Sequence, residues 1–455
     1  TYPDSSSSRI YLQNLKRKTD PGRPGRYSLA DLTKSDIESR QPGFTGRQTI
    51  IRLDSGVQQI KLDQNNTEVV NFNGNDGKND TFGIVQEYGF KPNDDEWKKV
   101  LLPWTVRAFN DDGQFNTVNK EENNGKPKYS QKYRSRDNGK HERNLGDIVN
   151  SPIVAVGGYL ATAANDGMVH IFKKNGGSDE RSYNLKLSYI PGTMPRKDIE
   201  SKDSTLAKEL RAFAEKGYVG DRYGVDGGFV LREVERGGKK HVFMFGAMGF
   251  GGRGAYALDL SKIDSGNGNL ADVSLFDVKN GNNGKNSNNS NNSVQLGYTV
   301  GTPQIGKTHN GKYAAFLASG YATKDINSTE NQTALYVYDL ENNNGTPIAK
   351  IEVKDGKGGL SSPTLVDKDL DGTVDIAYAG DRGGNMYRFD LSSDNPSSWT
   401  VRTIFQGTKP ITSAPAISQL KDKRVVIFGT GSDLSEDDVL STSEQYIYGI
   451  FDDDM

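Results

Sequence analysis

Short apolar runs separated by turns rich in Gly, Asn and Asp recur along the chain from residue 157 onward. Runs this short, bounded by turn residues and rich in aromatic side chains, predict β-strands. Most repeats contain an aromatic run that ends in Asp-Leu, and the full and degenerate versions occupy residues 168–172, 255–260, 335–340, 385–391 and 445–450. A second run begins with a small residue and a proline before an apolar strand, at Pro152, Pro303, Pro363 and Pro415. The pattern predicts an all-β chain built from repeats.

The spacing of these repeats indicates a β-propeller. From Pro303 to Pro363 and from there to Pro415 the intervals are 60 and 52 residues, which suits four-stranded blades with insertions. A single blade cannot bury both of its faces, whereas blades packed around an axis bury one another. Because such a ring has to close, we expect strand 445–450 to complete a blade begun by the N-terminal strands 49–53 and 57–62.

Three segments depart from the strand repeats. Apolar residues at helical spacing predict one short helix at 203–217. Residues 280–293 are almost entirely Asn, Gly and Ser, which predicts a disordered loop on one blade. Residues 1–145 are irregular, and we expect them either to contribute strands to the first blade or to form a partly separate lobe, while 146–455 form the propeller with its loop insertions.

Composition narrows the functional classes. The 455 residues carry a net charge of −2, which gives no long-range attraction to nucleic acid or to an anionic membrane. Without cysteine, the chain forms no disulfide, thiolate zinc site or cysteine nucleophile. No apolar run approaches the roughly 20 residues that span a bilayer. Because the chain begins at Thr1 rather than Met, we interpret it as a fragment or a processed form.

The candidate chemistry lies in the acidic segment 367–375, where four carboxylates alternate and Gly372 permits a sharp turn. Alternating oxygen ligands with glycine at the sixth position are typical of loops that wrap Ca²⁺, a hard cation that takes roughly six to eight oxygens. The predicted ligands are the side chains of Asp367, Asp369, Asp371 and Asp375 and the backbone carbonyl of Thr373.

This loop differs from an EF-hand, because Tyr378 stands at position twelve, where a bidentate Glu is expected. Its flanks, 361–366 and 374–379, are strand-like, which predicts a β-hairpin loop closed by Asp375. Two alternatives stay open. One is a solvated acidic turn without a metal, and the other is Mg²⁺, which demands tighter octahedral geometry.

No catalytic site emerges from the sequence. The four histidines have neither metal-binding spacing nor a nucleophile nearby in the sequence, and they are His141, His170, His241 and His309. His170 lies in an aromatic strand, where a packed or edge position is expected. The glycine-rich segment 246–254 lacks the Lys-Ser/Thr pair and the helix of a phosphate loop, so we interpret it as a turn between strands. The chain is therefore predicted to be neither an enzyme nor a binder of a small-molecule substrate.

Several segments together resemble the PilC/PilY family of type IV pilus biogenesis and pilus-tip adhesin proteins. They are 145–154, 218–221, 251–260 and the acidic loop in its setting, 362–391. The likeness covers roughly 145–455 in the same order. It implies that the chain is the C-terminal domain of such a protein and that the propeller is a modified, seven-bladed one.

The resemblance also implies a function in type IV pilus (fimbrium) biogenesis, twitching motility, host-cell adhesion and virulence. It places the chain outside the cytoplasm, at the bacterial surface, pilus tip or outer membrane, with pilins, minor pilins and the host-cell surface as partners. In the family, a calcium loop of this spacing governs pilus extension against retraction, and the motif falls here on 367–375. The Arg-Gly-Asp tripeptide by which some members bind integrin does not occur in this sequence.

A quinoprotein dehydrogenase is the alternative, because the Tyr-Ala-Leu-Asp-Leu strand also resembles that propeller superfamily. Those enzymes hold a quinone and calcium on the axis and repeat tryptophan docking motifs, whereas this chain has three tryptophans in all. The carboxylates also lie in one local loop, while a cofactor site needs ligands that converge from several blades.

Overall fold

The structure is a computed structural model. It describes residues 8, 10–11, 17–29, 33–35, 41–44, 46–72, 76–84, 94–106, 122–123, 126–127, 144–175, 183–193, 223–264, 268–281, 294–323, 331–342, 345–432, 434 and 436–454. The helix predicted at 203–217 lies outside the described residues, and so does all but the start of the polar loop 280–293. The described residues belong to two compact units. Unit 1 contains those up to 148 and those in 153–190, and unit 2 contains 149–152 and those from 191 onward.

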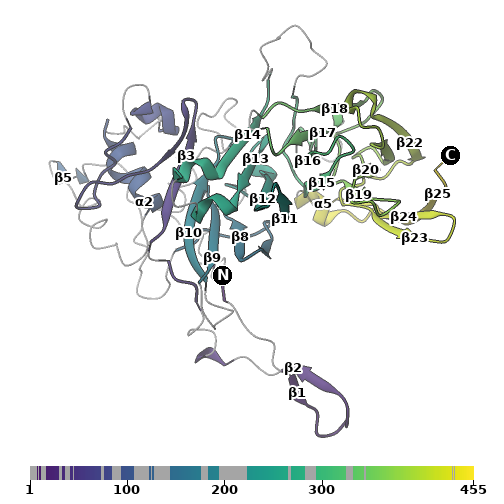
Figure 1. Ribbon diagram of the computed structural model, residues 1–455, viewed down its shortest axis with the longest axis horizontal. Helices are drawn as coiled ribbons and strands as arrows, with labels where there is room; N and C mark the ends of the chain where they lie inside the picture. Colours follow the sequence, from purple (N-terminus) through teal and green to yellow (C-terminus); the bar gives the residue numbers. More distant parts are fainter. Residues whose placement is uncertain are drawn as a thin grey trace. The chain divides into compact units, whose positions relative to one another are not determined.

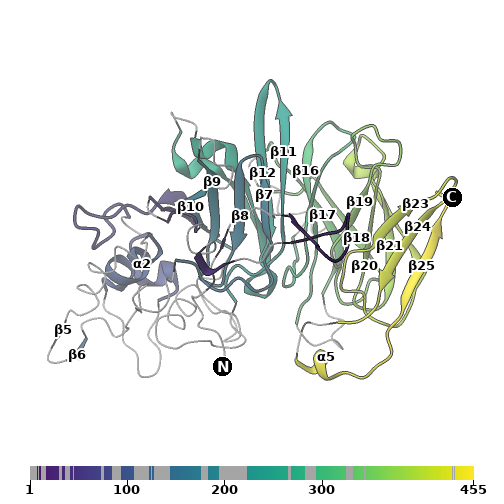
Figure 2. The same ribbon diagram turned by 90° about the horizontal axis from the view of Figure 1, so that it is seen from below.

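Unit 2 consists of consecutive antiparallel sheets, each formed by neighbouring strands of the chain (Figures 1 and 2). The first contains β11 (Phe229–Arg236), β12 (Lys239–Ala247), β13 (Gly254–Asp259) and β14 (Ser274–Lys279). The second contains β15 (Gln304–Lys307), β16 (Tyr313–Ala318), β17 (Thr333–Asp339) and β18 (Ala349–Val353). The third contains β19 (Thr364–Val366), β20 (Ile376–Gly380), β21 (Asn385–Asp390) and β22 (Thr400–Gln406). The last contains β23 (Ala416–Gln419), β24 (Arg424–Gly429) and β25 (Ile447–Asp452).

The aromatic runs of the sequence form the third strand of each sheet, and the Asp-Leu pairs mark where those strands end. The Asp339 carboxylate accepts the backbone N–H of Glu341 at 2.8 Å, and the Asp390 carboxylate accepts that of Ser392 at 3.0 Å. Such a bond to the residue two positions on turns the chain away from the strand. The leucine that follows each of these aspartates is buried. The motif therefore combines an aspartate that turns the chain with a leucine that is buried in the core.

The recurring prolines stand directly before the first strand of three sheets of unit 2. Pro303 precedes β15, Pro363 precedes β19 and Pro415 precedes β23. Proline has no N–H to donate to a sheet ladder, so it is tolerated where a strand is about to begin. The sequence repeat is thus a repeat of first and third strands.

The core of unit 2 lies between consecutive sheets, because each sheet packs its faces against its neighbours in the chain. One buried cluster joins the β11–β14 sheet to the β15–β18 sheet, and a second joins that sheet to β19–β22. A third joins β19–β22 to β23–β25. In β20, Ala377 and Ala379 belong to the second cluster, whereas Ile376 and Tyr378 belong to the third. This alternation is the expected result of the two-residue period of a strand that is buried on both faces.

Unit 1 contains a sheet of six strands in the order β4-β3-β10-β9-β8-β7. Its strands are β3 (Gln48–Leu53), β4 (Gly56–Gln59), β7 (Ile153–Val156), β8 (Tyr159–Ala163), β9 (Val169–Lys174) and β10 (Tyr183–Ile190). Strand β3 pairs in parallel with β10, from Gln48 opposite Leu187 to Ile51 opposite Ile190. A small core beneath the sheet includes Leu160, Phe172 and Leu185.

The pairing of β3 corrects one sequence prediction. The N-terminal strands were expected to complete a blade with the C-terminal strand, but β3 and β4 extend the β7–β10 sheet, while β25 pairs with β24. The physical reason is the apolar run of β3, whose Ile50 and Ile51 are fully buried beside β10. The division of the chain at residue 146 stays a prediction.

The remaining elements are short. In unit 1 they are β1 (Arg17–Thr19), β2 (Tyr27–Leu29), η2 (Asn79–Phe82), the π-helical η3 (Trp97–Leu101), α2 (Leu102–Val106), β5 (Glu122–Asn123) and β6 (Lys126–Pro127). In unit 2 they are η5 (Gly249–Gly251), η6 (Leu260–Asp264), η7 (Leu270–Val273), η9 (Pro396–Ser398) and α5 (Glu436–Leu440). Within the described part of the chain, no helix has the length and apolar character needed to cross a membrane.

Candidate metal centre

The acidic segment 367–375 forms the loop of the β19–β20 hairpin, whose last strand pair joins Val366 to Ile376. Two residues of the loop adopt left-handed backbone conformations, Leu370 with φ 57° and Gly372 with φ 87°. Glycine takes this conformation without cost, whereas the leucine is strained and its side chain is 88% exposed. These two left-handed residues turn the chain tightly at the tip of the hairpin.

Hydrogen bonds between residues two to five positions apart hold the loop in this shape. The two oxygens of Asp367 accept the backbone N–H groups of Asp371 at 3.2 Å and Gly372 at 2.8 Å. Asp371 Oδ1 accepts both the backbone N–H and the hydroxyl of Thr373, at 2.9 and 2.7 Å. These two bonds from Thr373 hold the pKa of Asp371 below its ordinary value. The loop is therefore held by hydrogen bonds from its own backbone and from Thr373 to two of its carboxylates.

The structure brings the four predicted side-chain ligands together. One oxygen from each carboxylate lies within 4.8 Å of the others, and the four residues are Asp367, Asp369, Asp371 and Asp375. Carboxylates this close repel one another unless a cation offsets their charge, and an all-oxygen set favours a hard cation. The metal-ligating role of the Thr373 carbonyl stays a prediction.

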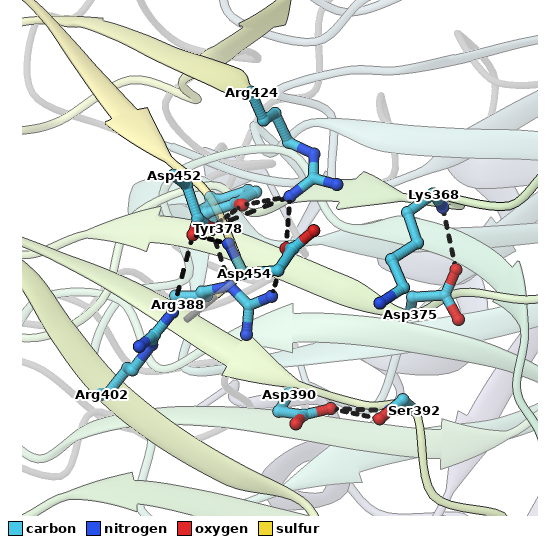
Figure 3. A network of polar contacts seen from close by, with 10 residues as sticks. All are labelled: Lys368, Asp375, Tyr378, Arg388, Asp390, Ser392, Arg402, Arg424, Asp452 and Asp454. Atoms are coloured by element: carbon cyan, nitrogen blue, oxygen red, sulfur yellow. Dashed lines mark hydrogen bonds and ion pairs between the residues drawn. The ribbon is translucent and has the colours of Figure 1, made fainter. Parts of the chain in front are cut away.

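Asp375 is anchored from two sides. Its Oδ2 accepts the backbone N–H of Lys368 at 2.8 Å (Figure 3). Its Oδ1 accepts a hydrogen bond from Nε2 of His309 at 2.7 Å, and that histidine lies in the β15–β16 hairpin of the preceding sheet. Sequence reasoning missed His309, since it found no partner for any histidine. Aligning the repeats at their prolines would have placed His309 in the loop equivalent to the acidic loop, because His309 and Asp369 both lie six positions after their prolines, Pro303 and Pro363.

A second polar cluster, in unit 1, has the residue types of a hydrolase. Nδ1 of His170 forms a hydrogen bond of 2.8 Å with Ser188 Oγ. Its Nε2 lies 2.9 Å from Asp166 Oδ2. All three side chains are fully buried, so a substrate has no access to the hydroxyl. Of the packed and edge positions predicted for His170, the structure shows the packed one, and the cluster ties β9 to β10 as part of the core.

Comparisons with known proteins place these features in context. The family model described as the PilY1 beta-propeller domain matches residues 145–455. The type IV pilus biogenesis factor PilY1 of Pseudomonas aeruginosa strain PAO1 is 29% identical over 372 residues, covering 68% of this chain and 28% of that protein. A PilY1 homolog of Xylella fastidiosa is 28% identical over 322 residues, covering 65% of this chain and 19% of the homolog.

Among solved structures, the C-terminal domain of Pseudomonas aeruginosa PilY1 matches with 27% sequence identity and a TM-score of 0.47. That match covers 65% of this chain and 57% of the solved chain. The chain thus spans less than a third of the length of the curated relatives that it matches.

Proposed function

Because the chain belongs to the PilY1 β-propeller domain family, we propose that it is the propeller module of a type IV pilus biogenesis factor. In this role it acts outside the cytoplasm, at the bacterial surface, pilus tip or outer membrane. Its partners are pilins and minor pilins on one side and the host-cell surface on the other. The names of the relatives in two bacterial genera support the pilus role.

The metal centre supplies the regulatory part of this proposal. Ca²⁺ binds to the 367–375 loop and biases the pilus between extension and retraction, which sets twitching motility. The observation that carries this proposal is the convergence of four carboxylates in one hairpin loop. A loop held by its own turns and open to solvent at Asp369 and Asp371 tolerates the irregular coordination of Ca²⁺ better than the strict octahedron of Mg²⁺.

Calorimetric titration with Ca²⁺ and Mg²⁺ after treatment with a chelator tests the metal centre. Asp369→Asn removes one charge from an exposed side chain, so it changes the ligand set without disturbing the core. We expect one calcium site in the wild type, weakened at least tenfold in the variant, and weak binding of Mg²⁺. Asp422→Asn is the matched control, because Asp422 is an exposed residue in the β23–β24 hairpin of the next sheet.

The pilus role is tested in a bacterium that carries Asp369→Asn or Asp422→Asn at the chromosomal locus of this chain. Surface pilus counts, twitching zones and attachment to host cells should change with the first variant and stay at wild-type level with the second. Calcium binding that survives Asp369→Asn would refute the loop as the site. Intact piliation after deletion of the whole locus would refute the biogenesis role.

We also propose that the chain is not an enzyme, which sets aside the quinoprotein dehydrogenase alternative. The relatives are named pilus biogenesis factors. The clustered carboxylates lie in one hairpin rather than converging from several blades. Added pyrroloquinoline quinone should therefore produce no dye-linked alcohol oxidation, and turnover in that assay would revive the alternative.

A further inference from the structure

Besides the hydrogen bonds within its own hairpin, the acidic loop makes contacts with the preceding sheet. Nε2 of His309 reaches Asp375 Oδ1 at 2.7 Å and lies 3.3 Å from the hydroxyl of Thr373. The backbone N–H of Val374 donates to the carbonyl of Lys307 at 2.8 Å. Lys307 ends β15 and His309 follows it in the β15–β16 loop. One short segment of the neighbouring sheet therefore holds the end of the loop.

These contacts fix one of the four carboxylates of the proposed metal site, that of Asp375. Asp375 is 2% exposed, and each of its oxygens accepts one hydrogen bond, from His309 and from the backbone of Lys368. A carboxylate oxygen has a second lone pair, so each bond orients the group and leaves capacity for a cation. Outer hydrogen bonds of this kind commonly set the orientation and affinity of metal ligands.

We propose that His309 is a positioning residue for the calcium loop, and that cation binding tightens the β15–β16 hairpin against the β19–β22 sheet. This inference rests on the calcium site proposed above. Because His309 holds Asp375 before the cation arrives, less ordering is left to occur on binding. Coupling of this kind is reciprocal, so the docked hairpin raises calcium affinity by the same factor by which calcium favours docking.

Calcium titration of His309 variants gives the first test. His309→Ala should weaken calcium binding about tenfold, the lower end of the range for an orienting partner. His309→Gln offers an amide N–H close to the position of Nε2 and should recover most of that loss. His241→Ala is the matched control, because His241 makes the same kind of bond to buried Asp259, at 2.8 Å, in the β11–β14 sheet. The control should bind calcium like the wild type.

Hydrogen exchange of residues 307–313, followed by mass spectrometry, gives a second readout that does not depend on affinity. At saturating Ca²⁺, amide exchange in this segment should slow in the wild type and in His309→Gln but not in His309→Ala. Circular dichroism in chelator checks that each variant is folded.

The outcomes separate the two proposals. Wild-type affinity in His309→Ala, or calcium protection of 307–313 that survives this change, would overturn the coupling and leave the metal site standing. Loss of binding in His309→Ala without recovery in His309→Gln would overturn the positioning role. A wild-type protein that binds no calcium would overturn the site and the coupling together.

Discussion

Replacing Asp452 with Asn is expected to loosen strand β25 from the neighbouring sheet by about 3 kcal/mol. Asp452 Oδ2 accepts a hydrogen bond from Nε of Arg388 at 2.7 Å and another from the hydroxyl of Tyr378 (Figure 3). Arg424 donates to the same hydroxyl at 3.1 Å and to Asp454 at 2.9 Å. The network therefore ties β25 to β20, β21 and β24.

The magnitude follows from burial. The side chains of Asp452, Arg388 and Arg424 are at most 9% exposed. Removing one charge from a buried ion pair costs about 3–5 kcal/mol, because the partner is left desolvated without its counter-charge. The lower end applies here, since Asn still accepts a hydrogen bond and Asp454 still offers a partly exposed charge to both arginines. A loss of about 3 kcal/mol corresponds to a roughly 150-fold larger equilibrium constant for local opening, and hence to amide exchange that is faster by the same factor.

Hydrogen exchange of residues 424–429 and 447–452 measures this opening directly. Glu233→Gln is the control, because Glu233 pairs with Lys240 at 3.3 Å with both side chains about half exposed. Exposed pairs contribute less than about 1 kcal/mol, so exchange in the last sheet should not change in this variant. Exchange of the Asp452→Asn protein within threefold of the wild type would refute the reasoning from burial.

The same network gives a pH dependence with a defined sign. Burial of Asp452 opposes its ionisation, but the hydrogen bonds from Tyr378 and Asp454 and the charge of Arg388 outweigh this, so its pKa lies below the ordinary value. A depressed carboxyl pKa stabilises the fold above the unfolded value of about 3.9, and this stabilisation is lost as the pH falls through the folded value. The difference in exchange between the wild type and Asp452→Asn should therefore be constant near neutral pH and shrink below about pH 4.

Three further changes test local features. Leu370→Gly relieves a left-handed conformation in an exposed side chain, so it should stabilise the calcium-free protein by about 1 kcal/mol in calorimetric melting, and a lower midpoint would contradict this. His170→Leu leaves the buried Asp166 carboxylate without its Nε2 partner and should cost unit 1 about 3 kcal/mol, whereas an unchanged melt would show that the pair contributes little. Gly251→Ala drives a Cβ into the carbonyl oxygen of Gly224 and should lower the free energy of unfolding by about 2–4 kcal/mol. An unchanged melting midpoint would show that the turn accommodates the added methyl group.

Much of the fold was predictable because its signals are local. Each aromatic run that ends in Asp-Leu combines a strand, a turn and a buried leucine within a few residues, and each proline marks the position just before a first strand. The acidic loop was predictable for the same reason, since its turns join residues at most five positions apart.

The contacts between sheets were not predictable from such signals. His309 and Asp375 are 66 residues apart, and Arg388 and Asp452 are 64 apart, so only the packing of whole blades brings them together. The parallel pairing of β3 with β10 joins residues more than a hundred positions apart and leaves no turn in the sequence to mark it. Register between repeats therefore carries more information about these contacts than any single motif.

The acidic loop and the Asp452 network lie on opposite faces of the same sheet, which predicts that they act independently. Asp375 has the strand parity of Ala377 and Ala379, which pack toward β15–β18, whereas Tyr378 packs toward β23–β25. The two groups share no hydrogen-bond partner among the described contacts. Changes at sites without shared partners usually add to within about 0.5 kcal/mol. Exchange of 447–452 in a protein that carries both His309→Ala and Asp452→Asn should therefore match that of Asp452→Asn alone within about threefold. A larger departure would mean that strand β20 transmits the state of the loop across the sheet, and the calcium effect would then extend beyond the preceding blade to β25.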